Sequence, residues 1–152
     1  MTAQGAHDAG APRYEHFPHD ADIGVRGFGR SPAEAFEQAA LAMTAVATRV
    51  ADIAPERTVD ITCEAPDLEL LLADWLNAIV YEMGARNMVF GRFEVLINVR
   101  IDSVRLEGKA FGETLDASKH EQGVEVKGAT YTSLEVAERA DGTWVAQCVI
   151  DV

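Results

Sequence analysis

The sequence is poor in basic residues and in cysteine, and it has no long apolar run. It carries 13 Lys and Arg against 25 Asp and Glu in 152 residues, which gives a formal net charge of −12 at pH 7. Nucleic-acid affinity depends on cationic side chains that displace counterions. The charge balance therefore argues against a broad RNA- or DNA-binding face and against an anionic membrane surface, although it leaves room for a local basic patch.

The two cysteines, Cys63 and Cys148, lie in separate β-type segments and form no C-x-x-C pair. They predict neither a disulfide framework nor a thiolate metal site, and we interpret them as small buried side chains. No apolar run reaches the roughly 18 to 20 residues that span a bilayer. Residues 1–13 lack the pattern of a secretory signal. We expect a cytoplasmic protein with a disordered lead-in over residues 1–13 and a single domain over residues 14–152.

Two segments predict amphipathic helices. The first covers residues 32–49 and opens on a capping box, in which Ser31 is the N-cap and Glu34 follows three residues later. The second covers residues 68–83, and we expect Gly84 to end it in a left-handed conformation. In both segments the apolar residues recur at steps of three and four, so each helix should bury one face.

Several other segments alternate apolar and polar residues with a period of two, which is typical of half-buried strands. They cover residues 14–17, 23–28, 57–65, 89–101, 104–110, 124–130, 133–137 and 144–150. The polar stretch 114–123 predicts a loop or a short helix. Most strands come late instead of alternating with helices. The sequence therefore predicts an α+β fold, an antiparallel or mixed β-sandwich with two amphipathic helices packed on it.

A first candidate site is the cluster of His16, His19, Asp20 and Asp22 near the start of the domain. Two imidazoles and two carboxylates around the bend at Pro18 are able to bind a metal ion or to form an acid and base pair. Solvated or capping side chains at a strand end would produce the same pattern.

A second candidate is the end of the chain, where the Asp151 side chain lies beside the main-chain carboxylate of Val152. Both groups are ionised at pH 7. Together they offer oxygen donors to a hard cation such as Ca²⁺ or Mg²⁺. A plainly solvated chain end is the alternative.

A third candidate is Lys127, which alternates out of register with Val124 and Val126 and so projects from the opposite face. It is suited to contact a partner's carboxylate or phosphate, or it protects an exposed strand. The sequence has no nucleophile elbow, no H-E-x-x-H motif and no glycine-rich phosphate loop. Nothing in it therefore predicts a hydrolase that acts alone.

Together these segments resemble the archease family. The resemblance runs from about Tyr14 to Val152 and joins YEHFPHDADIGVRGFG, the capped helix, DLELLLADWLNAIVYE, HEQGVEVKGATY and the terminal VIDV, in that order. It implies a protein cofactor that activates an RtcB-type ligase in tRNA splicing and RNA repair by promoting guanylylation and multiple turnover. It implies no enzyme activity of the chain's own.

The resemblance also implies a divalent-metal site made by Asp22, Asp151 and Val152, most often with calcium, although oxygen ligands accept Mg²⁺ or Mn²⁺ as well. It implies that Lys127 contacts the ligase. Two positions depart from the family pattern: Asp20 replaces a threonine, and Thr132 replaces a histidine.

Two other functions remain open from the residues alone. One is a free-standing metal-dependent enzyme that uses Asp22, Asp151 and His19 on a small phosphorylated substrate. The other is a chaperone-like modulator of a tRNA-modifying enzyme.

Overall fold

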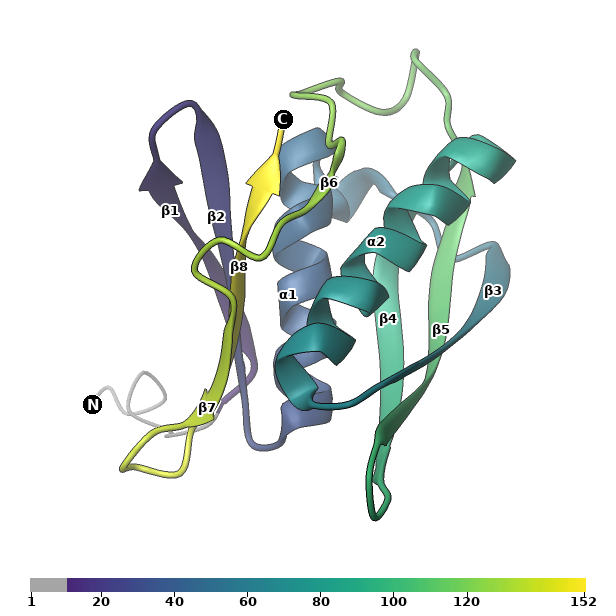
Figure 1. Cartoon of the computed structure of the whole chain (residues 1–152). Coiled ribbons are helices and arrows are strands. Elements are labelled where there is room, and N and C mark those ends of the chain that lie inside the picture. Colours follow the sequence, from purple (N-terminus) through teal and green to yellow (C-terminus); the bar gives the residue numbers. More distant parts are fainter. Residues whose placement is uncertain (1–10) are drawn as a thin grey trace, which may run out of the picture.

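Two antiparallel β-sheets enclose two helices in the computed structural model, which describes residues 11–152 (Figure 1). The first sheet has the order β1-β2-β8-β6, with β7 also paired to β8, and the second has the order β3-β5-β4. The helices are α1 (Pro32–Ala47) and α2 (Leu68–Arg86). The strands are β1 (Arg13–His19), β2 (Asp22–Gly29), β3 (Arg57–Ala65), β4 (Met88–Val99), β5 (Val104–Thr114), β6 (Gly128–Ala129), β7 (Glu135–Glu138) and β8 (Trp144–Asp151).

Helix α1 is fixed against the first sheet by its cap and by a close approach at Gly27. The Ser31 hydroxyl accepts a hydrogen bond from the Glu34 N–H at 3.2 Å, as the capping box predicts. A Cβ atom on Gly27 would lie 2.3 Å from both Ala35 O and Ala39 N. Only glycine therefore lets β2 approach the helix backbone this closely.

The core lies between the sheets, and Trp75 of α2 is at its centre. Its side chain is fully buried, and its Nε1–H donates to the carbonyl of Phe36 in α1 at 3.2 Å. The ring of Phe93 packs edge-on against it, with ring centroids 5.9 Å apart. This indole therefore joins both helices to the second sheet.

The helix ends differ from the prediction. Helix α1 stops at Ala47 instead of residue 49, because Thr48 is extended (φ −163°) and a 3₁₀ turn, Val50–Asp52, follows. Helix α2 continues past Gly84 to Arg86, and Asn87 ends it in the left-handed region (φ 53°). Asparagine tolerates this conformation, so it replaces glycine as the terminator.

The strand predicted over residues 124–130 is mostly wrong, because only Gly128–Ala129 pairs with β8. The N–H groups of Gly123 and Val124 donate instead to the carbonyls of Ala47 and Val46 at the end of α1. These bonds turn residues 121–127 into an irregular strap across the ends of the helices.

The predicted fold class is confirmed, and every strand pair of the described residues is antiparallel. The position of both helices between the two sheets was not specified by the pattern. Of the predicted lead-in, residues 1–10 lie outside the described residues, while Arg13 belongs to β1 and pairs with Phe28 of β2. Among residues 11–152, no helix is both long and apolar enough to cross a membrane.

Candidate functional site

Asp22 and Asp151 occupy facing positions at one end of the first sheet. Asp22 opens β2 and Asp151 closes β8, and the adjacent pair Ile23 and Ile150 is in register. The next opposed positions are therefore those of the two aspartates. The N–H of Val152 donates to Asp22 Oδ1 at 3.3 Å. The structure thus brings Asp22 next to the end of the chain.

Lys127 lies at the same end of the sheet. Its N–H donates to the carbonyl of Asp151 at 2.8 Å, and the following residue, Gly128, pairs with Asp151 in β6. Its side chain is exposed. Figure 1 shows the C terminus, the turn between β1 and β2 and the start of β6 at the same end of the molecule. All four residues of the predicted site therefore share one edge.

The remaining members of the first cluster, His16, His19 and Asp20, make other contacts. His16 is directed at α1, where its Nε2 lies 2.7 Å from the carbonyl of Ala42, which must be the acceptor. His19 is the cross-strand partner of Asp22, and its buried Nδ1 has no hydrogen-bond partner among the described residues. Asp20 has φ 51° in the turn, a conformation that a short polar side chain tolerates.

The donor set at this edge suits a hard cation. In the described residues, no three Asp, Glu, His or Cys side chains come close enough to hold a metal ion. Two aspartates therefore need a third donor, and Val152, whose N–H contacts Asp22, is the residue beside them. Carboxylate and main-chain oxygens are ligands that Ca²⁺, Mg²⁺ and Mn²⁺ accept. The residues present fit such an ion.

A second polar network, which the sequence did not predict, anchors the segment before the strap. Glu113 Oε2 lies 2.8 Å from His120 Nε2. The same oxygen accepts a hydrogen bond from the backbone N–H of Ala54 at 2.9 Å. The N–H of Asp116 donates to His120 Nδ1 at 2.9 Å, so Nε2 carries the proton and the imidazole is neutral. The sequence signal was an acidic residue at the end of an alternating strand, seven positions before a histidine.

Glu113 is held in its charged form. The ammonium of Lys119 lies 2.8 Å from its carboxylate, and this bond, the Ala54 N–H and His120 together lower the pKa of Glu113 to about 2. The side chain of His120 is almost fully buried. The network therefore ties residues 113–120 to the loop that follows α1.

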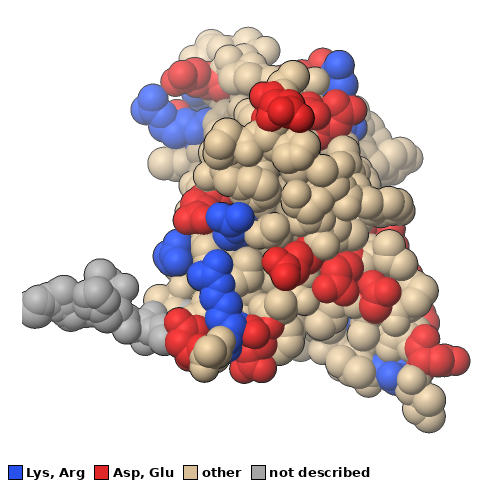
Figure 2. Space-filling view, turned by 60° about the vertical axis from the view of Figure 1, so that its left-hand side comes forward, with Lys and Arg blue, Asp and Glu red and all other residues tan. Residues whose placement is uncertain are grey.

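Arginines of β1, β2 and the turn between β7 and β8 form a local basic patch. In Figure 2, basic side chains gather in one column on the face that the first sheet presents. The guanidinium groups of Arg13 and Arg139 lie 3.7 and 5.0 Å from the centroid of the same ring, Phe28. Arg26 forms an ion pair with Glu15 and thereby lowers the pKa of that carboxyl. The patch is small and partly neutralised.

Comparison with known proteins identifies relatives over almost the whole chain. The model of the Archease protein family matches residues 14–152. A protein archease of Pyrococcus furiosus is 41% identical over 140 residues, which covers 92% of this chain and 99% of that protein. A protein archease of Methanosarcina barkeri is 36% identical and covers all of both chains.

The fold has a solved counterpart as well. The solution structure of Methanobacterium thermoautotrophicum protein 1598 superposes with a TM-score of 0.81 at 30% sequence identity. The match covers 91% of this chain and 98% of that one. Both β-sheets and both helices therefore belong to an arrangement that is already known.

Proposed function

The chain belongs to the archease family, and on that premise we propose that it is a cytoplasmic protein cofactor that activates an RtcB-type RNA ligase. In this proposal it promotes guanylylation of the ligase and sustains multiple turnover in tRNA splicing and RNA repair. The chain itself catalyses no reaction.

The observation that carries the proposal is the contact between Asp22 and the end of the chain. Asp22, Asp151 and the carboxylate of Val152 would hold a divalent cation, with Ca²⁺ as the first choice and Mg²⁺ or Mn²⁺ as alternatives. Such an ion supplies a positive charge and open coordination positions that accept phosphate oxygens. This chain's residues would present those positions at an exposed edge.

Lys127 would act beside this edge as a contact to the ligase. Its side chain is exposed, and its backbone N–H is hydrogen-bonded to the carbonyl of Asp151. This bond holds the base of the lysine side chain next to the acidic residues. An ammonium is a compact point charge that suits a carboxylate or a phosphate of the partner.

The test measures guanylylation of the purified ligase by GTP, with and without this protein. Asp22→Asn and Asp151→Asn should each abolish the acceleration and the calorimetric signal of Ca²⁺ binding. The matched control is Asp102→Asn, in the distant turn between β4 and β5. Unchanged acceleration by both site variants would refute the role of the acidic edge.

Two further measurements separate the alternatives. Turnover of GTP without any ligase would favour a free-standing enzyme. Improved solubility of a tRNA-modifying enzyme, without any effect on the ligase, would favour a chaperone-like modulator.

A further inference from the structure

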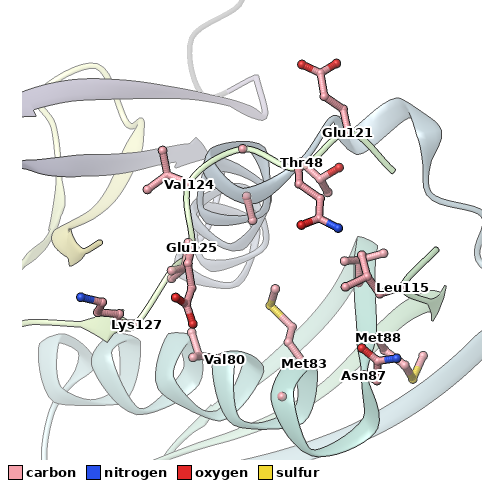
Figure 3. Close-up of a pocket in the computed structure, with 16 residues that line it drawn as sticks. Thr48, Val80, Met83, Asn87, Met88, Leu115, Glu121, Val124, Glu125 and Lys127 are labelled. Carbon is pink, nitrogen blue, oxygen red and sulfur yellow. The ribbon is translucent and has the colours of Figure 1, made fainter. Parts of the chain in front are cut away.

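The cleft between the strap and the second half of α2 is balanced in charge. It has a volume of about 560 Å³, and Figure 3 shows Met83 of α2 and Glu125 of the strap on its two sides. Glu121 of its rim pairs with Arg49 at 3.2 Å, and Lys127 offsets Glu125. The cleft therefore selects neither a cationic nor an anionic ligand.

A second hollow, of about 500 Å³, lies on the outer face of the second sheet and is acidic. Lys109 is the one basic residue of its lining, and it pairs with Asp60 at 2.9 Å. The lining carboxylates are those of Glu37, Asp60, Glu94 and Glu107. All of them form an ion pair with a Lys or Arg except Glu37, which forms none among residues 11–152. The hollow thus leaves one carboxylate for an external cation.

This hollow borders β4, the edge strand of the second sheet, and the outer side of β4 is open at two residues. The N–H of Arg100 donates to the carbonyl of Ser103 at 2.8 Å, so the even-numbered residues in this half of β4 bond to β5. Ile97 and Val99 therefore direct their N–H and C=O groups away from the sheet. No described residue bonds to these outward groups.

Helix α1 closes the same edge two residues earlier. Glu37 Oε2 accepts a hydrogen bond from the N–H of Val95 at 2.8 Å. Burial raises the pKa of the Glu37 carboxyl, and the charges of Glu34 and Glu94 add to the rise. A cation placed beside this carboxylate would offset both effects.

The end of β4 carries exposed apolar side chains and a cation without a partner. Leu96 and Val99 are 60% and 78% exposed, and Ile101 in the turn is fully exposed. Arg100 is exposed as well and forms no ion pair among the described residues. Figure 1 shows the hairpin of β4 and β5 extending past the first turn of α1. An open strand edge with apolar side chains is a template for pairing with another chain.

We propose that this edge pairs with the same edge of a second copy of the chain, in a two-fold dimer centred on Asn98. In this register Ile97 of each copy lies opposite Val99 of the other, and each pair exchanges both of its backbone hydrogen bonds. All the open groups of these two residues are then used. Val95 keeps its bond to Glu37, so the pairing ends there.

The same register matches the side chains. Arg100 of one copy lies opposite Leu96 of the other, one position from Val95, where its guanidinium group reaches the carboxylate of Glu37. Within one copy, Arg100 is about 17 Å along the strand from Val95, so this ion pair forms only between copies. Val99 packs beside Ile97 of the other copy. One edge thus supplies both the unpaired cation and the unpaired carboxylate, which favours a second copy over a different protein.

The dimer does not involve the acidic edge and does not depend on ligase activation. Its pairing covers few residues, so it is weak and forms at high protein concentration. Sedimentation velocity of the full chain, from micromolar to millimolar concentration, measures it. We expect the sedimentation coefficient to rise with concentration.

A charge reversal tests the ion pair. Arg100→Glu should raise the Kd of the dimer about tenfold or more, because it places a second carboxylate beside Glu37. The matched control is Arg57→Glu, at an exposed arginine on β3, the opposite edge of the same sheet. Equal weakening by both variants would contradict the pairing, since only net charge would then matter.

A cysteine on the two-fold axis tests the register. The two Asn98 Cα atoms would lie about 4.5 Å apart, within the range of a disulfide, so Asn98→Cys should form a linked dimer under mild oxidation. Leu96→Cys should not link to itself, because its two copies would lie about 14 Å apart, but it should link to Arg100→Cys when the two variants are mixed. The wild type, with Cys63 and Cys148, gives the baseline.

Three outcomes would overturn the proposal. One is a monomer at millimolar concentration with no linked dimer of Asn98→Cys, and perturbation of β4 amides in that monomer by the ligase would assign the edge to the ligase. Another is equal linking of Asn98→Cys and Leu96→Cys, which indicates random collision. The third is a dimer that Arg100→Glu does not weaken, which would place the interface elsewhere.

Discussion

The backbone N–H of Val152 donates to Asp22 Oδ1 at 3.3 Å, although 130 positions separate the two residues. The contact joins the first β-hairpin to the last strand and places Asp22 at the edge that also holds Asp151 and Val152. Carboxylates that share a site repel one another, and a cation bound between them would offset that repulsion.

Calcium should therefore stabilise the folded protein. A ligand at about 100 times its Kd adds about 2.7 kcal/mol, which corresponds to a rise in Tm of about 5 °C or more for a chain of this size. The measurement is thermal unfolding by circular dichroism, in Ca²⁺ and in a chelator. Asp151→Asn should lose most of the rise, and a full rise in that variant would exclude Asp151 as a ligand.

A glycine appended after Val152 should abolish both the calcium effect and the activation of the ligase. The extra residue moves the main-chain carboxylate by about 3.5 Å while both aspartates and the core stay in place. The Tm in chelator should not change. The control carries the added glycine before Met1 instead, and a loss in both proteins would show that the end carboxylate is not the cause.

Lys127→Ala should lower the acceleration of ligase guanylylation without weakening Ca²⁺ binding. The ammonium group is proposed to contact the ligase, whereas the calcium donors are carboxylates. Lys109→Ala is the matched control, because Lys109 is an exposed strand lysine that pairs with Asp60 on the other sheet. If Lys127→Ala and Lys109→Ala reduce the acceleration equally, Lys127 has no specific contact.

Glu113→Gln should destabilise the protein at neutral pH and lose its effect in acid. The pKa of Glu113 is lowered from 4.5 to about 2, so its charge stabilises the fold above pH 4.5, and this contribution disappears as the pH falls toward 2. Urea unfolding of both proteins across this range measures the difference. A difference that stays constant down to pH 2 would mean that the charge of Glu113 contributes nothing.

Two glycine substitutions should have opposite effects on the free energy of unfolding. Gly27→Ala places a Cβ atom 2.3 Å from the backbone of α1 and should cost about 1–3 kcal/mol, or more, because backbone cannot yield locally. Gly84→Ala adds a Cβ atom in open space inside α2 and should stabilise by about 0.5–1 kcal/mol. Urea unfolding curves give both changes in the free energy of unfolding. Changes of the same sign would contradict the packing described.

The sequence alone determined the elements whose pattern is local. Helix α1 begins where Ser31 and Glu34 predicted, because a capping box needs only neighbouring residues. The α+β class and most strands followed from period-two alternation. The family resemblance indicated Asp22, Asp151, Val152 and Lys127. It did not specify the strand pairing that brings residues so far apart in the sequence together.

Only the tertiary structure decided which distant groups meet. Pairing of β2 with β8 sets Asp22 opposite Asp151, and register between strands depends on the whole sheet. The strap is unpaired because the end of α1 accepts its N–H groups and Asn77 closes the edge of β6, both of which are contacts between separate elements. Alternation in residues 124–130 predicted a strand there, and only Gly128–Ala129 forms one. A local pattern specifies which face of a strand is buried, but it does not specify whether a partner strand is present.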